Sequence, residues 1–156
     1  MGTSNWRDDR LGSAERDENP LVLLRVRSGF VVLGDTQFLP GYCLLLCSPR
    51  VEHLSDLSPE ARREFLHEMS LVGEAIERVC RPRGLRRINY EIAGNSDPFI
   101  HAHIIPRYEW EPAEFRVVPA SHYPAAIRAA PEDQFSPERH GELRAQLSAA
   151  LRALFD

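Results

Sequence analysis

The 156-residue sequence predicts a single α+β domain in which helices pack on an antiparallel sheet. Three observations support this fold class. Short apolar, β-branched runs occur in two groups, at residues 21–47 and 86–105. A longer segment with helical apolar spacing follows each group. Turn residues separate the runs within a group, so neighbouring strands are expected to be antiparallel.

The first group begins with a predicted hairpin. Residues 21–27 and 30–33 are apolar runs, and the Ser-Gly pair between them is typical of a tight turn. A Pro-Gly pair at 40–41 marks the next turn, and residues 42–47 are continuously apolar. We therefore expect three strands before the first long helix, with the third one buried.

The first long helix is predicted to begin at residue 59. Ser58 is a favourable N-cap, and Pro59 suits the first helical position. Apolar residues then recur at steps of four and three, as Phe65, Met69, Val72, Ile76 and Val79. Pro82 and Gly84 are expected to end this helix.

The second group of strands covers residues 86–92 and 99–105, and a loop between them predicts another antiparallel hairpin. Residues 107–136 have several prolines in or beside them and are expected to be mostly irregular. A second long helix is expected after Ser136, again with a Ser-Pro-Glu start. Its apolar face is formed by Leu143, Leu147, Leu151 and Leu154.

The predicted organisation has three parts: a flexible N-terminal tail at 1–20, a core domain at 21–110, and an irregular segment with a C-terminal helix at 111–156, packed on the same domain. The net charge of −4 provides no general attraction to nucleic acid. No apolar run approaches the roughly 20 residues that span a bilayer. We expect a cytoplasmic protein without a signal peptide and with no membrane or nucleic-acid partner.

The strand at 99–105 carries the most informative side chains. Alternation places Ile100, Ala102 and Ile104 on one face, and Phe99, His101, His103 and Ile105 on the other. The wholly apolar set fits the side covered by helices. His101 and His103 are therefore expected to face away from the helices, and a role as ordinary core histidines is the less favoured interpretation.

Two outward imidazoles permit two kinds of chemistry. A shared metal ion needs a third ligand, but Arg107 and Tyr108 occupy the places where a carboxylate would follow. Phosphoryl chemistry is favoured, because a neutral imidazole with a pKa of about 6.5 is a good nucleophile at neutral pH. All 19 basic residues are arginines, which excludes a Schiff-base lysine and a phosphate-loop lysine.

Residues 88–108, INYEIAGNSDPFIHAHIIPRY, resemble the histidine triad (HIT) family of nucleotide hydrolases and transferases. Upstream, residues 29–60 resemble the family's strand, Pro-Gly turn, long strand and helix start. The resemblance implies a five-stranded antiparallel sheet with two main helices, usually assembled as a homodimer. That architecture agrees with the order of elements expected from the sequence.

The Pro-Arg pair at 106–107 sets the register of the resemblance. His103 matches the third histidine of the family motif, and His101 matches the middle one, which implies that His101 is the nucleophile. The phosphate-binding residues implied by the resemblance are Asn89, Asn95 and Ser96. Those implied for the ribose and base are Asp35, Phe30 and Leu33.

The sequence departs from the family pattern at two positions. Phe99 replaces the first histidine, and Tyr42 stands after the Pro-Gly turn where many members carry another histidine. We expect these two rings to form an aromatic pair that supports the site by packing.

The resemblance implies a hydrolase or transferase that needs no cofactor and no metal, and that acts on a purine nucleotide. The substrate classes it implies are dinucleoside polyphosphates and nucleoside phosphoramidate-type conjugates, attacked to form a nucleotidyl-His101 intermediate. Two alternatives stay open. Phe99 and Tyr42 motivate a nucleotide-binding or interaction module with weak or no catalysis, and the two histidines motivate a less favoured His-x-His metal site.

Overall fold

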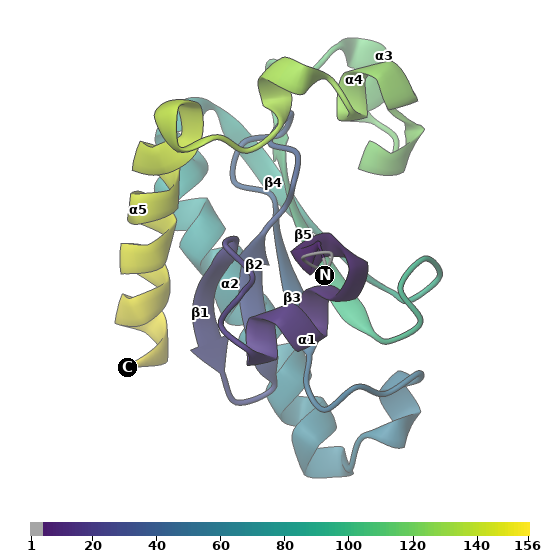
Figure 1. Ribbon diagram of the computed structural model, residues 1–156. Helices are drawn as coiled ribbons and strands as arrows, with labels where there is room; N and C mark the ends of the chain where they lie inside the picture. Colours follow the sequence, from purple (N-terminus) through teal and green to yellow (C-terminus); the bar gives the residue numbers. More distant parts are fainter. Residues whose placement is uncertain (1–4) are drawn as a thin grey trace.

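A computed structural model describes residues 5–156 and contains the predicted antiparallel sheet of five strands, in the order β1-β2-β3-β5-β4 (Figure 1). The strands are β1 (Val22–Val26), β2 (Gly29–Leu33), β3 (Cys43–Cys47), β4 (Leu85–Ala93) and β5 (His101–Tyr108). The helices are α1 (Arg10–Glu15), α2 (Pro59–Cys80), α3 (Ala113–Arg116), α4 (Ala125–Arg128) and α5 (Pro137–Phe155). The α+β class, the strand number and the two main helices are confirmed.

The first hairpin forms where the Ser-Gly pair predicts it. Gly29 has a φ of +152°, and a Cβ there would lie 1.7 Å from the carbonyl oxygen of Leu46, so only glycine fits. The carboxylate of Glu68 on α2 accepts hydrogen bonds from the backbone N–H groups of Arg27 and Ser28. The hairpin is thereby fastened to the main helix.

Both long helices begin at their predicted caps. Ser58 Oγ accepts a hydrogen bond from the Ala61 N–H, and Ser136 Oγ accepts one from the Arg139 N–H. Within residues 5–156, no helix is both long and apolar enough to cross a membrane.

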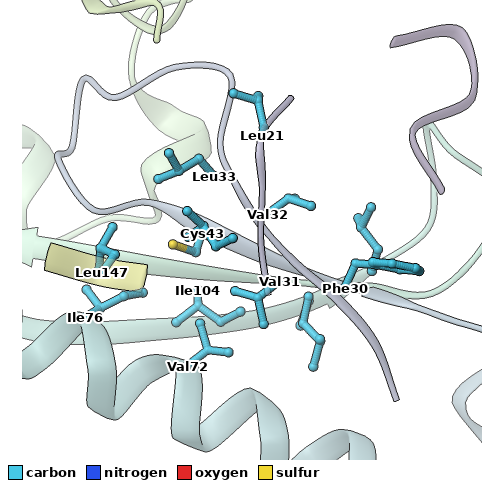
Figure 2. Packing of buried hydrophobic residues seen from close by; sticks show 14 of the residues in the cluster. Leu21, Phe30, Val31, Val32, Leu33, Cys43, Val72, Ile76, Ile104 and Leu147 are labelled. Atoms are coloured by element: carbon cyan, nitrogen blue, oxygen red, sulfur yellow. The ribbon is translucent and has the colours of Figure 1, made fainter. Parts of the chain in front are cut away.

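The hydrophobic core lies between the sheet and the two long helices. Figure 2 shows Val72 and Ile76 of α2 beside Ile104 of β5, with Leu147 of α5 nearby. Ala102 and Ile104 are fully buried, as alternation along β5 predicts. The other face of β5, which carries the histidines, is left for the site.

The N-terminal segment differs from the predicted flexible tail. Residues 1–4 of that tail lie outside the described residues. A 3₁₀ turn at Trp6–Asp9 leads into α1, where Leu11 and Ala14 are buried. Six residues are too few for a helix that is stable by itself. Packing on the rest of the chain therefore orders this segment. The sequence pattern alone does not predict a helix here, because six residues are too few to show a helical repeat of apolar positions.

Residues 107–136 are more regular than predicted. Residues 107 and 108 complete β5, and the remainder includes α3, α4 and 3₁₀ turns at Ala120–His122 and Pro131–Asp133. Pro112, Pro119 and Pro124 precede helical turns as N-cap residues. Proline prevents long helices but is compatible with their starts, so the same residues that indicated irregularity initiate short helical turns.

Candidate active site

The two histidines lie in the floor of a pocket of about 390 Å³ on the face of the sheet opposite α2. In the register of the sheet, Leu46 of β3 lies beside His101, and Leu44 lies beside His103. The N-terminal segment contributes Trp6 to the pocket lining. His101 is only 8% exposed. The histidine face is thus turned away from the helical core, as predicted, but it is covered by other parts of the chain.

The backbone fixes the tautomer of His101. Its Nδ1 lies 2.9 Å from the carbonyl oxygen of Phe99. Because a carbonyl oxygen only accepts hydrogen bonds, Nδ1 of His101 is protonated and its N–H is the donor. The lone pair of the neutral ring is then on Nε2. This arrangement uses the backbone of residue 99, so it does not need a histidine side chain there.

His103 has the opposite tautomer. Its Nδ1 lies 2.5 Å from the Tyr42 hydroxyl. Burial raises the pKa of Tyr42, so the phenol stays protonated and its O–H donates a hydrogen bond to Nδ1 of His103. The Nε2 of His103 therefore carries a hydrogen. Burial, together with the neighbouring His101, lowers the pKa of His103 to about 4, which keeps the ring neutral at pH 7.

The histidine pair thus combines a ring nitrogen that carries a lone pair with a ring N–H that can donate a hydrogen bond. The two rings lie 4.9 Å apart between centroids, in an edge-to-face arrangement. Nε2 of His101 offers a lone pair, and Nε2 of His103 offers an N–H. This combination suits attack on a phosphorus atom, with one ring forming the new bond and the other binding a phosphoryl oxygen.

The predicted aromatic pair is separated in the structure. The Phe99 ring lies 5.3 Å from the His101 ring, whereas the Tyr42 ring lies 6.0 Å from the His103 ring. Each aromatic residue therefore contacts a different histidine. Phe99 supports the site by packing, with the Arg50 guanidinium 4.8 Å from its ring centroid. Tyr42 supports the site by a hydrogen bond, so the expectation of packing alone is wrong for this residue.

The low pKa of His103 predicts a pH-dependent stability. An unfolded histidine binds a proton near pH 6.5, but folded His103 does so only near pH 4. The unfolded chain therefore holds the extra proton between these values, and this contribution to stability is lost as the pH falls from about 6.5 to 4. Thermal unfolding of His103→Gln should show a smaller drop in Tm over this range than the wild type. Equal drops would contradict the assignment.

Asp35 lies in the pocket, where the resemblance implies a contact with ribose. Arg10 binds its carboxylate with two hydrogen bonds of 2.6 and 2.9 Å, and Arg7 binds it at 3.2 Å. Burial raises the pKa of Asp35, but the hydrogen bonds from both arginines outweigh this effect and keep that pKa below its usual value. A ribose bound here would share the Asp35 carboxylate with Arg10. Sequence patterns alone do not identify Arg10 as a site residue, because it lies in the segment predicted to be a flexible tail.

Of the two residues expected around the nucleotide base, Phe30 and Leu33, only Leu33 lines the pocket. Phe30 shares the histidine face but is buried outside the pocket lining. Leu33 reaches the lining, although its pairing with Cys43 puts it on the helix-covered face. Val32 faces the pocket beside Leu44 and was missed. Residues three apart in a strand cannot share a face, so alternation alone favoured Val32 over Leu33 as the companion of Phe30.

The structure brings two of the three expected phosphate-binding residues to the histidines. Asn95 and Ser96 line the same pocket as His101. Asn89 does not, because it pairs with Ile105, and its Oδ1 accepts a hydrogen bond of 3.1 Å from Arg107. On β4 it is Glu91 that lies beside His103. The structure therefore places Asn89 outside the lining of the pocket that holds the histidines, paired with Arg107.

The third ligand that a His-x-His metal site requires is also not in place. In the part of the chain that the structure describes, no three histidine, cysteine, aspartate or glutamate side chains converge in a way that could hold an ion.

Comparisons with known proteins give a consistent result. Residues 19–110 match the family model described as HIT domain. The chain is 31% identical over 78 residues to Protein hit of Bacillus subtilis, covering 49% of this chain and 54% of the relative. It is 26% identical over 95 residues to AP-4-A phosphorylase of Mycobacterium tuberculosis, covering 59% and 49%. The chain thus spans about half the length of the curated relatives it matches.

A solved structure shows the same fold. The histidine triad protein of Marinobacter aquaeolei superimposes with a TM-score of 0.69 at 23% identity, covering 85% of this chain and 89% of that one. The superposition covers more of the chain than residues 19–110 alone.

Proposed function

Because the chain belongs to the HIT domain family, we propose that it is a nucleotidyl hydrolase or transferase with His101 as its nucleophile. The opposite tautomers of the two histidines are the observation that carries the proposal. The Phe99 carbonyl leaves the lone pair of His101 on Nε2, and the Tyr42 hydroxyl leaves a hydrogen on Nε2 of His103. Both neighbours are fixed by the fold before a substrate arrives.

The proposed reaction has two displacements. Nε2 of His101 forms a bond to the α-phosphorus as the bond from phosphorus to the leaving group breaks, and the leaving group takes up a proton from solvent, to which the attacking water of the second displacement returns one. The positive charge of the substituted ring is stabilised by the Nδ1–H hydrogen bond to the Phe99 carbonyl. Water then attacks the phosphorus, the P–N bond breaks, and the nucleoside monophosphate leaves with the water oxygen.

The remaining residues bind the substrate. His103, Asn95 and Ser96 lie around the pocket where phosphoryl oxygens would be bound, and they donate hydrogen bonds to the developing charge. Asp35 accepts from ribose hydroxyls, and apolar residues such as Val32 surround a purine base. Dinucleoside polyphosphates and nucleoside phosphoramidates both present an α-phosphorus of this kind. One relative carries the name AP-4-A phosphorylase, which supports the first class.

The proposal includes a homodimer, as in the resemblance. β4 is an edge strand of the sheet, so its outer backbone groups are available to a second copy. Tyr90 on this strand is 46% exposed, which is consistent with such a contact.

The test uses diadenosine tetraphosphate and adenosine 5′-phosphoramidate, each with and without EDTA. Release of AMP at the same rate in EDTA is expected, because no step of the proposal uses a metal. Release that stops in EDTA would favour the metal site. Tight binding of AMP by calorimetry without turnover of either compound would favour the second candidate function, a nucleotide-binding module. The specific observation behind that candidate is that Phe99 stands where the family motif has its first histidine.

A further inference from the structure

A second pocket, of about 540 Å³, adjoins the first at His103. Four residues line both pockets, namely Thr36, Tyr42, Ser96 and His103. The outer wall of the second pocket is formed by residues 120–129, around α4. This wall lies beyond residue 110, outside the region that matches the family model. The pocket therefore combines residues of the matched region with residues of the C-terminal segment, beside a histidine of the proposed reaction.

Buried charges hold one end of this wall in place. Arg107, which is 3% exposed, donates to the Glu111 carboxylate and to the carbonyl oxygens of Phe115 and Val118. Glu111 also accepts a 2.7 Å hydrogen bond from the Tyr123 hydroxyl. Since Tyr123 immediately precedes the turn that starts α4, the wall is positioned by a buried network and not by loose surface contacts.

The other end of the segment is attached to the loop after β2. The Phe135 N–H donates to the Asp35 carbonyl at 2.8 Å, and the Gln37 N–H donates to the Asp133 carbonyl at 2.7 Å. Figure 1 shows this segment, with α3 and α4, gathered at one end of the sheet. A wall attached at both ends gives the pocket a defined shape in the absence of a ligand.

The lining of the second pocket is mainly apolar with balanced charge. Phe38, Ile105 and several alanines supply the apolar surface. Among the described residues that line this pocket, Arg128 and Glu91 are the charged ones. Arg128 Nε donates to the Tyr123 carbonyl at 2.9 Å, which leaves its terminal N–H groups to a ligand. A volume of this size and a lining without net charge suit a nucleoside better than ammonia or inorganic phosphate.

We propose that the second pocket binds the leaving half of the substrate, a nucleoside polyphosphate, while the first pocket holds the nucleotidyl group that is transferred. This inference rests on the proposed function. The two pockets meet at His103, next to His101, so a dinucleoside polyphosphate spans both, with its phosphate chain across the two histidines. Arg128 binds a phosphate of the leaving half, and the apolar wall contacts its base.

The experiment compares two substrates that transfer the same AMP. Diadenosine tetraphosphate has a large leaving group that needs the second pocket, and adenosine 5′-phosphoramidate has a small one that does not. Ala125→Trp places a large side chain in the pocket. Ala126→Trp is the matched control, because Ala126 is exposed on the same short helix but is absent from the lining. Arg128→Gln removes the proposed phosphate contact.

Ala125→Trp and Arg128→Gln are each expected to lower kcat/KM for diadenosine tetraphosphate by about tenfold or more, and that for the phosphoramidate by less than about twofold. Ala126→Trp should leave both values near the wild type. Equal effects of Ala125→Trp on the two substrates, or no effect on either, would overturn the proposal.

A failure of the proposed function gives a different pattern, in which the wild type turns over neither substrate. Calorimetry then compares AMP with a diadenosine tetraphosphate analogue that carries methylene bridges. A second pocket for the other half predicts tighter binding of the analogue than of AMP, and loss of that difference in Ala125→Trp. Equal affinities in the wild type would overturn the inference by themselves.

Discussion

Replacement of His101 by alanine is expected to lower turnover by about 10³-fold or more, since the proposed reaction uses the lone pair on Nε2 of His101 to attack phosphorus. The fold should persist, because the strand is held by pairing with β3 and β4 on both sides. Initial rates with diadenosine tetraphosphate measure the loss. A circular dichroism spectrum and a melting curve similar to the wild type would confirm that chemistry, not folding, is affected.

Two further variants separate a nucleophile from a merely structural histidine. His101→Gln keeps most of the buried volume, so it should be as inactive as the alanine variant but closer to the wild type in stability. His67→Ala removes an exposed histidine of α2 and should leave the rate unchanged. With substrate labelled in the α-phosphate, wild type quenched in an alkaline denaturant, in which a P–N bond to imidazole is stable, should retain label on the protein, and His101→Gln should not. Retained activity in either His101 variant would contradict the assignment.

Replacement of Arg107 by methionine is expected to lower the free energy of unfolding by about 3–5 kcal/mol, because it leaves the buried Glu111 carboxylate without its cation. Burial raises the pKa of Glu111, but hydrogen bonds from Arg107, the Tyr108 N–H and Tyr123 outweigh it and keep that pKa below its usual value. Urea denaturation measures the change. The double variant Arg107→Met with Glu111→Gln should lose less stability, since it leaves no buried charge.

The matched control for this prediction is Arg63→Met. Arg63 also pairs with a glutamate three positions away, but both side chains are more than 70% exposed, and such pairs contribute little. A loss in Arg107→Met no larger than that in Arg63→Met would show that the buried network does not hold the C-terminal segment. Arg107→Met should also loosen the outer wall of the second pocket, because Arg107 donates hydrogen bonds to the carbonyl groups at the base of that wall.

Local sequence patterns were sufficient for the main elements of the fold. The Ser-Pro-Glu starts at 58 and 136, the apolar stripes and the two-residue alternation each depend on neighbours close in the chain, and each appears in the structure where predicted. The same patterns were insufficient for the N-terminal helix. It is six residues long, and it is ordered by burial of Leu11 and Ala14 against residues far along the chain.

The sequence by itself determined the order of strands and helices, the face on which His101 and His103 lie, and the resemblance that indicates His101 as the nucleophile. Only the tertiary structure decided the tautomer of His103, the separation of Phe99 from Tyr42, the engagement of Asp35 by Arg10 and the position of Asn89 outside the pocket. The physical reason is the range of the interactions. Periodicity is a property of adjacent residues, whereas the Tyr42–His103 hydrogen bond joins residues 61 positions apart, and the pair of Arg10 with Asp35 joins residues 25 positions apart.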